Sequence, residues 1–147
     1  MPQSLSCLYV HLVFSTKGRA SMIPEEHRSD LHAYFGGIAK GIDCAPLAIG
    51  GTTDHVHILL RLHRKKTVSD AVRDLKSNSS SWMKSRRPEF SWQSGYGAFS
   101  VGEREVPGVK QYISSQEDHH ANASFQDELR KLLREHNLEW DERYLWD

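Results

Sequence analysis

The chain of 147 residues is poor in cysteine, in long apolar runs and in net charge. Its two cysteines, Cys7 and Cys44, argue against a disulfide framework and indicate a reducing, cytoplasmic compartment. The early apolar stretch at residues 5–14 is interrupted by polar residues and is too short to span a bilayer. We therefore expect neither a signal peptide nor a membrane segment.

The composition suits one compact domain over residues 1–147. An apolar fraction of 38% is low, but an aromatic fraction of 10% argues against disorder. The net charge is zero, yet residues 1–101 hold thirteen Lys and Arg against eight Asp and Glu, whereas residues 102–147 hold six against eleven. The first part would attract a phosphate backbone, although solvated loops explain the same clusters.

Residue patterns predict strands at 7–14, 45–49, 55–62 and 98–101. Helical spacing and capping residues predict helices at 24–41, 67–87, 107–119 and 124–135. This order predicts an α+β, ferredoxin-like (RRM-like) fold, with a mostly antiparallel four-stranded sheet, helices on one face and additional C-terminal helices. We expect the other sheet face to stay free for a ligand or partner, and the acidic, aromatic tail at 140–147 has no assigned role.

Two histidines, His55 and His57, lie in the predicted strand at 55–62. Side chains alternate along a strand, so these two imidazoles share a face, and every second residue from Val56 to Leu62 gives the opposite face an apolar surface. Two imidazoles whose backbones lie roughly 7 Å apart can converge on one divalent ion. The pattern alone equally fits two half-exposed strand histidines, because a site also needs a third ligand and a reacting group.

The predicted helix at 107–119 supplies candidates for both. Tyr112 and Gln116 are four residues apart, so they are stacked on one helix face beside the apolar stripe of Val109 and Ile113. This placement can aim a phenol and an amide oxygen at the neighbouring sheet. A phenol with a pKa of about 10 is a poor nucleophile at neutral pH unless a metal or base activates it. Taken separately, a packing tyrosine and a surface glutamine explain the same residues.

The combination resembles the HUH endonucleases, specifically the small single-tyrosine transposases of IS-two-hundred type. The name denotes a histidine, an apolar residue and a histidine, here His55-Val56-His57. Four stretches of the chain carry the resemblance in order: YVHLVFSTK at 9–17, DHVHILL at 54–60, WQSGYGAFSV at 92–101, and YISSQ at 112–116 followed by His119-His120.

The resemblance implies an enzyme that binds single-stranded DNA, often near a hairpin. A tyrosine hydroxyl attacks the scissile phosphate, which leaves a 5′-phosphotyrosine link and a free 3′-OH, and rejoining reverses the step. Carried over by position, Tyr112 matches the nucleophile, His55 and His57 match two metal ligands, and Gln116 matches the third. The implied cofactor is Mg²⁺ or Mn²⁺, and the implied assembly is a homodimer in which the tyrosine can serve the partner's site.

Other residues are candidates for DNA contact. We expect phosphate contacts from basic residues and base stacking from loop aromatics; these are Lys17, Arg19, Arg61, Arg64, Lys65, Lys66, Trp92 and Tyr96. His11 is interpreted as a structural histidine of the first strand. His119 and His120 could approach the metal, although solvation at a helix end is the simpler interpretation.

Two alternatives stay open. A non-catalytic module could bind single-stranded nucleic acid through an open sheet face, as RNA-binding domains of this fold do. A domesticated relative could cut hairpins in host repeats without mobilising an element. A covalent protein–DNA product separates the first alternative from a transposase, and the DNA flanking the gene separates the second.

Overall fold

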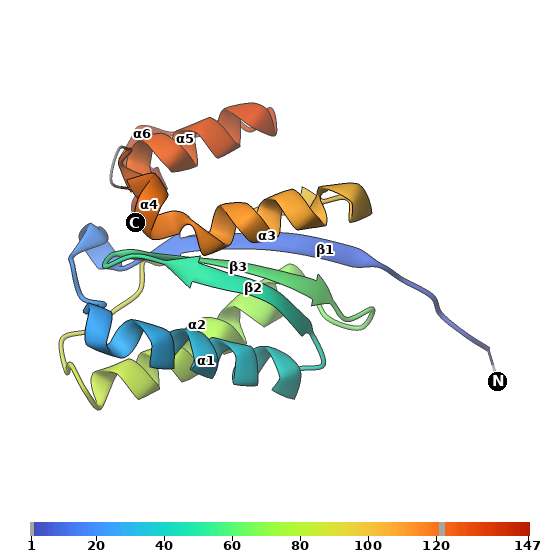
Figure 1. Ribbon diagram of the computed structural model, residues 1–147, viewed down its shortest axis with the longest axis horizontal. Helices are drawn as coiled ribbons and strands as arrows, with labels where there is room; N and C mark the ends of the chain where they lie inside the picture. Colours follow the sequence, from blue (N-terminus) through green and yellow to red (C-terminus); the bar gives the residue numbers. More distant parts are fainter. Residues whose placement is uncertain (1, 121–122) are drawn as a thin grey trace.

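The computed structural model describes residues 2–120 and 123–147. Its centre is a four-stranded sheet in the order β2-β3-β1-β4, in which all neighbouring strands are antiparallel. The strands are β1 (Leu8–Ser15), β2 (Ala45–Gly51), β3 (His55–Leu62) and β4 (Gly97–Val101). Helices α1 (Glu25–Gly41) and α2 (Val68–Lys84) cover one face (Figure 1). The predicted ferredoxin-like arrangement is confirmed.

The predicted helix starts rest on side-chain caps. Thr67 Oγ1 accepts a hydrogen bond from the Asp70 amide at 3.0 Å and begins α2. Ser124 Oγ accepts one from the Asp127 amide at 3.1 Å and begins α5 (Phe125–Glu135). Each cap satisfies an amide that the first helical turn leaves without an intrahelical acceptor.

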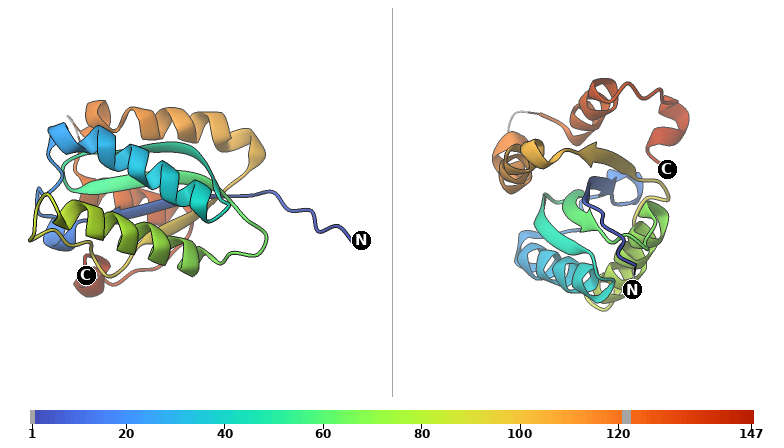
Figure 2. Two further views of the ribbon diagram at one scale, coloured as in Figure 1. Left: turned by 90° about the horizontal axis from the view of Figure 1, so that it is seen from below. Right: turned by 90° about the vertical axis from the view of Figure 1, so that its right-hand side faces the viewer.

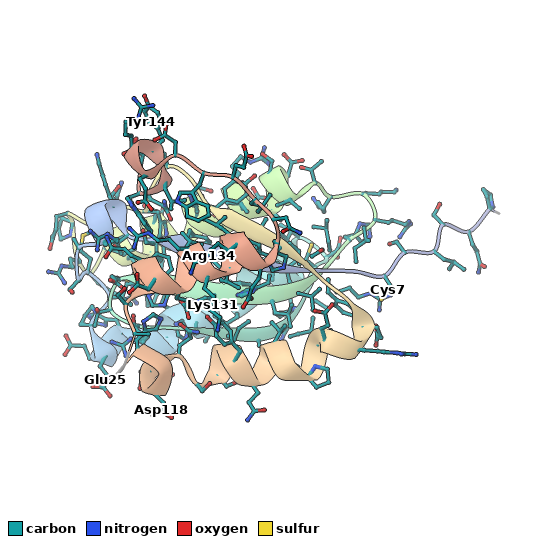
Figure 3. All side chains as sticks on the ribbon, turned by 90° about the horizontal axis from the view of Figure 1, so that it is seen from above. Cys7, Glu25, Asp118, Lys131, Arg134 and Tyr144 are labelled. Atoms are coloured by element: carbon teal, nitrogen blue, oxygen red, sulfur yellow. The ribbon has the colours of Figure 1, made fainter. Side chains whose placement is uncertain are left out.

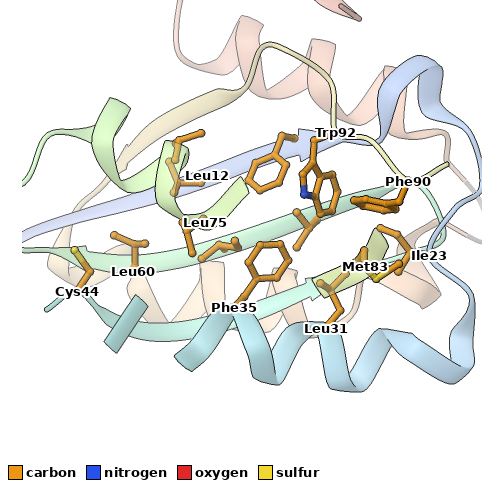
Figure 4. Close-up of a cluster of buried hydrophobic side chains, with 14 of the residues drawn as sticks. Leu12, Ile23, Leu31, Phe35, Cys44, Leu60, Leu75, Met83, Phe90 and Trp92 are labelled. Atoms are coloured by element: carbon orange, nitrogen blue, oxygen red, sulfur yellow. The ribbon is translucent and has the colours of Figure 1, made fainter. Parts of the chain in front are cut away.

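The main core lies between the sheet and the pair α1–α2. The apolar face of β3 meets Phe35 and Leu31 of α1, together with Leu75 of α2 (Figure 4). Trp92, in the segment before β4, packs edge-on against Phe14 with ring centroids 4.9 Å apart. The apolar face of the strands is therefore buried against α1 and α2, as predicted, and the histidines lie on the opposite face.

The expectation of a free second sheet face is wrong for the described residues. Helices α3 (Val106–Ser114), α4 (Gln116–His120) and α5 lie over that face (Figures 1 and 2). Apolar side chains drive this packing, because Phe125 and Leu129 of α5 join Val13 and Phe99 in a buried cluster. The polar residues of the sheet are thus enclosed between two layers rather than presented to solvent.

The acidic tail that had no assigned role packs against the same layer. It forms the short helix α6 (Glu142–Leu145), and Trp146 next to it lies with its ring centroid 5.3 Å from the Arg130 guanidinium of α5. Arg130 also bonds Glu142 at 2.7 Å, and the Gly95 amide donates to the carbonyl of Asp147 at 2.9 Å. The tail therefore ties α5 to the segment before β4.

The helix predicted at 107–119 is divided. Ser115, with φ −103° and ψ 22°, ends α3, and α4 begins at Gln116. The break changes the direction of the chain directly after the tyrosine-bearing helix. Among the described residues, no helix has the length and apolarity needed to cross a membrane.

Candidate active site

The two histidines open β3 on its polar face. His55 and His57 are 1% and 0% exposed, and their ring centroids are 5.2 Å apart. The predicted shared face is confirmed, but the rings are fully enclosed because α4 and α5 cover them. Phe125 of α5 stacks on the His55 ring at a centroid distance of 4.3 Å.

Different groups orient the two rings. His55 Nδ1 lies 2.8 Å from Asp54 Oδ1 and 3.0 Å from Thr52 Oγ1. His57 Nδ1 lies 2.8 Å from Nε2 of His11 on the adjacent strand β1. In both cases Nδ1 is held by the protein and Nε2 points toward the same interior space. His11 is thus a contact of the predicted metal pair and not an isolated structural histidine.

Tyr112 and Gln116 arrive at this space from the covering layer. Gln116 Oε1 lies 3.0 Å from His55 Nε2, and the Tyr112 ring centroid is 5.7 Å from that of His57. Gly50 of β2 permits the approach, because a Cβ there would lie 2.1 Å from the carbonyl oxygen of Ile113. The glycine lets the backbone of α3 rest directly on the sheet, so the structure brings the four predicted site residues together.

The residue that sequence reasoning missed is Glu128 of α5, which is 4% exposed. Its Oε1 lies 2.9 Å from His57 Nε2 and 3.0 Å from His120 Nε2. Its Oε2 accepts hydrogen bonds from the Tyr112 hydroxyl and from Gln116 Nε2, the latter at 3.0 Å. A signal was present in the sequence, because this carboxylate interrupts the apolar stripe that α5 buries.

The electrostatics follow from these contacts. Burial alone would raise the pKa of the Glu128 carboxyl, but hydrogen bonds from His120 and His57 hold it well below its usual range. Burial, and then the bond to Glu128, raises the pKa of the Tyr112 phenol above its ordinary value. Burial lowers the pKa of His57. Burial, and then the neighbouring His57, lowers the pKa of His11 to about 3. The described site thus favours an ionised Glu128 carboxylate, neutral rings at His11 and His57, and a neutral Tyr112 phenol.

The arrangement fits a divalent cation. Nitrogens of His55 and His57 and a Glu128 oxygen lie within 4.8 Å of one another, and all three residues are buried. His55 Nε2 is 3.6 Å from Glu128 Oε1 and 3.0 Å from Gln116 Oε1. His57 Nε2 is 2.9 Å from Glu128 Oε1. Neighbouring ligands of an octahedral ion at about 2.1 Å lie about 3 Å apart, so the spacing matches one ion. A mixed set of imidazole nitrogens and oxygens suits Mg²⁺ or Mn²⁺.

A second observation supports the fit. The Asp54 carboxylate can only accept, so it places the His55 proton on Nδ1 and leaves Nε2 of the neutral ring bare. That nitrogen faces the carbonyl oxygen of Gln116, whose amide nitrogen is already committed to Glu128. Two acceptors 3.0 Å apart repel unless positive charge lies beside them, either a proton on His55 or a shared cation.

A cleft of about 310 Å³ leads from the surface to this centre. It lies between α3 and α5, which run side by side over the sheet (Figure 3). Tyr112, Glu128 and His11 line its inner part, and Lys131 and Glu135 line it from α5. The half-buried Tyr112, together with Glu128 and His11, therefore borders an open volume.

The predicted DNA-contact residues fall into separate regions. Lys17 and Arg19 form a short turn, η1 (Lys17–Arg19), beyond the end of β1 that pairs with His55. Four others lie at or beyond the opposite end of β3, at least about 13 Å along the strand from His57; these are Arg61, Arg64, Lys65 and Lys66.

The two loop aromatics also differ in position. Tyr96 is 43% exposed, whereas Trp92 is 8% exposed and donates its indole N–H to Ser79 Oγ at 2.9 Å. The position of Trp92 in the core does not support its predicted contact with a base. The side chain of His119 lies outside the described part of the structure, and His120 contacts Glu128.

The fold and site define an α+β protein with a histidine-rich polar centre enclosed beneath C-terminal helices. The family described as "Transposase IS200 like" matches residues 4–116. The chain belongs to this family of IS200-like transposases, and the resemblance drawn from the motifs is confirmed. Among curated proteins, none matches the chain.

Two solved structures are similar. A Deinococcus radiodurans R1 protein that is assigned as a transposase aligns with a TM-score of 0.64 and 26% identity, over 79% of this chain and 95% of that one. A REP-associated tyrosine transposase bound to a REP hairpin aligns with a TM-score of 0.61 and 12% identity over 82% of this chain and 72% of that one. At 12% identity the second likeness concerns the fold.

Proposed function

We propose that the protein is a single-stranded DNA transposase that cuts and rejoins strands through Tyr112 with the help of Mg²⁺ or Mn²⁺. The observation that carries the proposal is the convergence of the tyrosine hydroxyl and the histidine pair on one buried carboxylate, Glu128. Neither packing nor folding requires a phenol, two imidazoles and a carboxylate at one buried point. Membership of the transposase family supports the same conclusion.

In the proposed reaction the Tyr112 oxygen attacks the scissile phosphorus, and the bond from phosphorus to the 3′ oxygen breaks. Glu128 Oε2 accepts the hydrogen bond of the phenol, so it is the group placed to take the proton and return it to the departing 3′ oxygen. The products are a 5′-phosphotyrosine and a free 3′-OH. A bound divalent ion would neutralise charge on the phosphodiester and favour ionisation of a nearby hydroxyl.

The same residues run the reverse step. A 3′-OH that enters the site attacks the phosphotyrosine, and the Tyr112 oxygen regains a proton from Glu128. The energy of the phosphodiester is kept in the covalent link, so rejoining needs no nucleotide cofactor. His55, His57 and Gln116, with Glu128 as an additional oxygen donor, are the proposed ligands of the ion.

The substrate is proposed to enter through the cleft between α3 and α5, because Tyr112 borders it. A hairpin-containing element end is the favoured substrate, since the similar REP-associated transposase carries a REP hairpin. Tyr112 lies beside His57 of its own chain, which supports action within one subunit. If a homodimer forms, mixing a Tyr112 variant with a His57 variant tests whether the subunits share sites.

The test incubates the protein and Mn²⁺ with labelled single-stranded oligonucleotides taken from the DNA that flanks its gene. A covalent protein–DNA band should form with wild type and with the matched control Tyr144→Phe, whose ring is 64% exposed and far along the chain. The band should disappear in Tyr112→Phe and in His57→Ala. An adduct of undiminished yield in Tyr112→Phe would reject the nucleophile, and DNA binding without any adduct would favour the non-catalytic module.

A further inference from the structure

His11 and His57 form a buried imidazole pair, of which the proposed reaction uses only His57. The two rings come from the adjacent strands β1 and β3 and stack with centroids 5.0 Å apart and planes 28° from parallel. His11 Nε2 and His57 Nδ1 are 2.8 Å apart, and His11 is only 3% exposed. One proton must lie between these two nitrogens, since a hydrogen bond of this length needs one donor and one acceptor.

His55, the other histidine of the proposed metal site, has a partner of a different chemical kind. Asp54 holds His55 with a carboxylate, which can only accept when ionised. A neutral imidazole nitrogen either donates or accepts, according to its tautomer. Thr52 Oγ1 donates to Asp54 and so also accepts from His55 Nδ1. The orientation of His57 is therefore fixed by a group that can serve either tautomer of the ring, whereas the groups that fix His55 serve only one.

Two states of the site require opposite tautomers of His57. In the arrangement seen here, Glu128 Oε1 is an acceptor 2.9 Å from His57 Nε2, so that nitrogen carries the proton and Nδ1 accepts from His11. When Nε2 binds an ion it must be bare, so the proton sits on Nδ1 and is donated to His11. A carboxylate in the place of His11 could not donate to Nδ1 of His57, so His57 would lose this hydrogen bond in the first state.

We propose that His11 is the positioning residue of His57 and that the two rings exchange donor and acceptor roles when the divalent ion binds. This inference rests on the proposed metal-dependent function. The proton count is conserved: each ring gives up its Nε2 proton and takes one at Nδ1, so the pair holds two protons before and after. His57 thereby stays hydrogen-bonded to His11 in both states and keeps its orientation.

The binding test measures the Mn²⁺ affinity of the full chain by titration calorimetry. His11→Leu removes both donor and acceptor, and we expect an affinity loss of about 10- to 100-fold, as for other groups that orient metal-binding histidines. His11→Gln keeps an amide that can donate or accept, and it should bind within a few-fold of wild type. His27→Leu is the control, because His27 lies on α1, which covers the other face of the sheet, and pairs there with Glu26.

A measurement without variants at position 11 tests the exchange directly. Imidazole ¹⁵N spectra of the wild type, with His57 identified by its loss in His57→Gln, should show the proton on Nε2 without ion. The proton should move to Nδ1 when Mg²⁺ is added, and the His11 signals should change in the same direction. These spectra depend on neither DNA nor cleavage.

The outcomes separate the two proposals. Unchanged Mn²⁺ affinity in His11→Leu, or a His57 tautomer that is the same with and without Mg²⁺, overturns the role of His11 and leaves the proposed function intact. Failure of the wild type to bind any divalent ion overturns the metal-dependent function and this inference with it. A large loss in His11→Leu that His11→Gln also shows would mean that size and not hydrogen bonding matters, which likewise overturns the inference.

Discussion

The hydroxyl of Tyr112 donates a hydrogen bond to the carboxylate of Glu128, 16 residues further along the chain. This contact joins α3 to α5 across the inner end of the cleft. Because the other oxygen of Glu128 lies 2.9 Å from His57 Nε2, a single carboxylate connects the proposed nucleophile with the proposed metal ligands. The proposed function therefore depends on the position of α5 over the sheet, which packing also fixes.

Glu128→Gln should impair both metal binding and cleavage. The amide keeps the shape of the side chain but loses the charge that attracts a cation, and its NH₂ group can no longer accept from Tyr112 and His57 together. We expect Mn²⁺ affinity to fall by about 10- to 100-fold, by analogy with other altered metal environments, and adduct yield to fall in parallel. Calorimetry and the oligonucleotide assay provide the two measurements.

The matched control is Asp127→Asn, which removes an exposed carboxylate from the same helix at a position outside the cleft. It should leave both readouts near wild type. A Glu128→Gln protein that binds Mn²⁺ and forms adduct at wild-type levels would show that the carboxylate contributes only to packing.

Asp54→Ala should weaken metal binding through His55 alone. The carboxylate holds Nδ1 of that ring at 2.8 Å, and burial of the carboxyl is outweighed by the His55 contact, which keeps its pKa below the usual range. Loss of the partner frees the ring to rotate and to change tautomer, so we expect an affinity loss of about tenfold or more. Asp30→Ala on the exposed side of α1 is the control. Equal Mn²⁺ affinity in both variants would argue that Thr52 and the stacking of Phe125 are enough to fix the ring.

The local features of this protein could be read from its sequence. Strand alternation placed His55 and His57 on one face, and capping residues such as Thr67 marked where helices begin. These predictions succeeded because each depends on a few neighbouring residues and on backbone geometry. The family motifs added Tyr112 and Gln116 as partners of the histidines.

The missed features depend on contacts between distant segments. Glu128 interrupts the apolar stripe of α5, but the sequence does not say that this helix packs on β3, where the carboxylate meets His57. The covered sheet face was missed for the same reason, since the apolar stripe of α5 does not say which surface it buries. His11 was interpreted as a structural histidine without a named partner, because only the register of β1 on β3 brings it next to His57.

Gly50→Ala should disturb the site through the backbone. A Cβ at this position would lie 2.1 Å from the Ile113 carbonyl oxygen, so α3 must shift away from β2 and carry Tyr112 with it. We expect lower adduct yield and a loss of stability of about 1–3 kcal/mol, typical of an overpacked interior. Thermal unfolding and the adduct assay measure the two effects.

Gly37→Ala is the matched control, since nothing lies within 4 Å of its Cβ position on α1. Alanine favours a helix interior over glycine by roughly 0.5–1 kcal/mol, so this variant should be slightly more stable and fully active. If Gly50→Ala behaves like Gly37→Ala, the close approach of α3 to β2 does not hold the tyrosine in place.

His32 should make stability depend on pH between about 4 and 6.5. Burial, and then the nearby Arg28, lowers the pKa of this imidazole to about 4. Below about pH 6.5, the ordinary pKa of histidine, the unfolded chain binds a proton at His32 that the folded chain does not bind. The neutral His32 therefore contributes fully to the free energy of unfolding above about pH 6.5, and this contribution is lost as the pH falls toward 4. The full loss is about 3 kcal/mol at most. His32→Gln cannot titrate, so urea unfolding at pH 7 and pH 4.5 should show a smaller loss of stability in the variant than in wild type. An identical loss of stability in both proteins would mean that His32 binds a proton equally well in the folded and the unfolded chain.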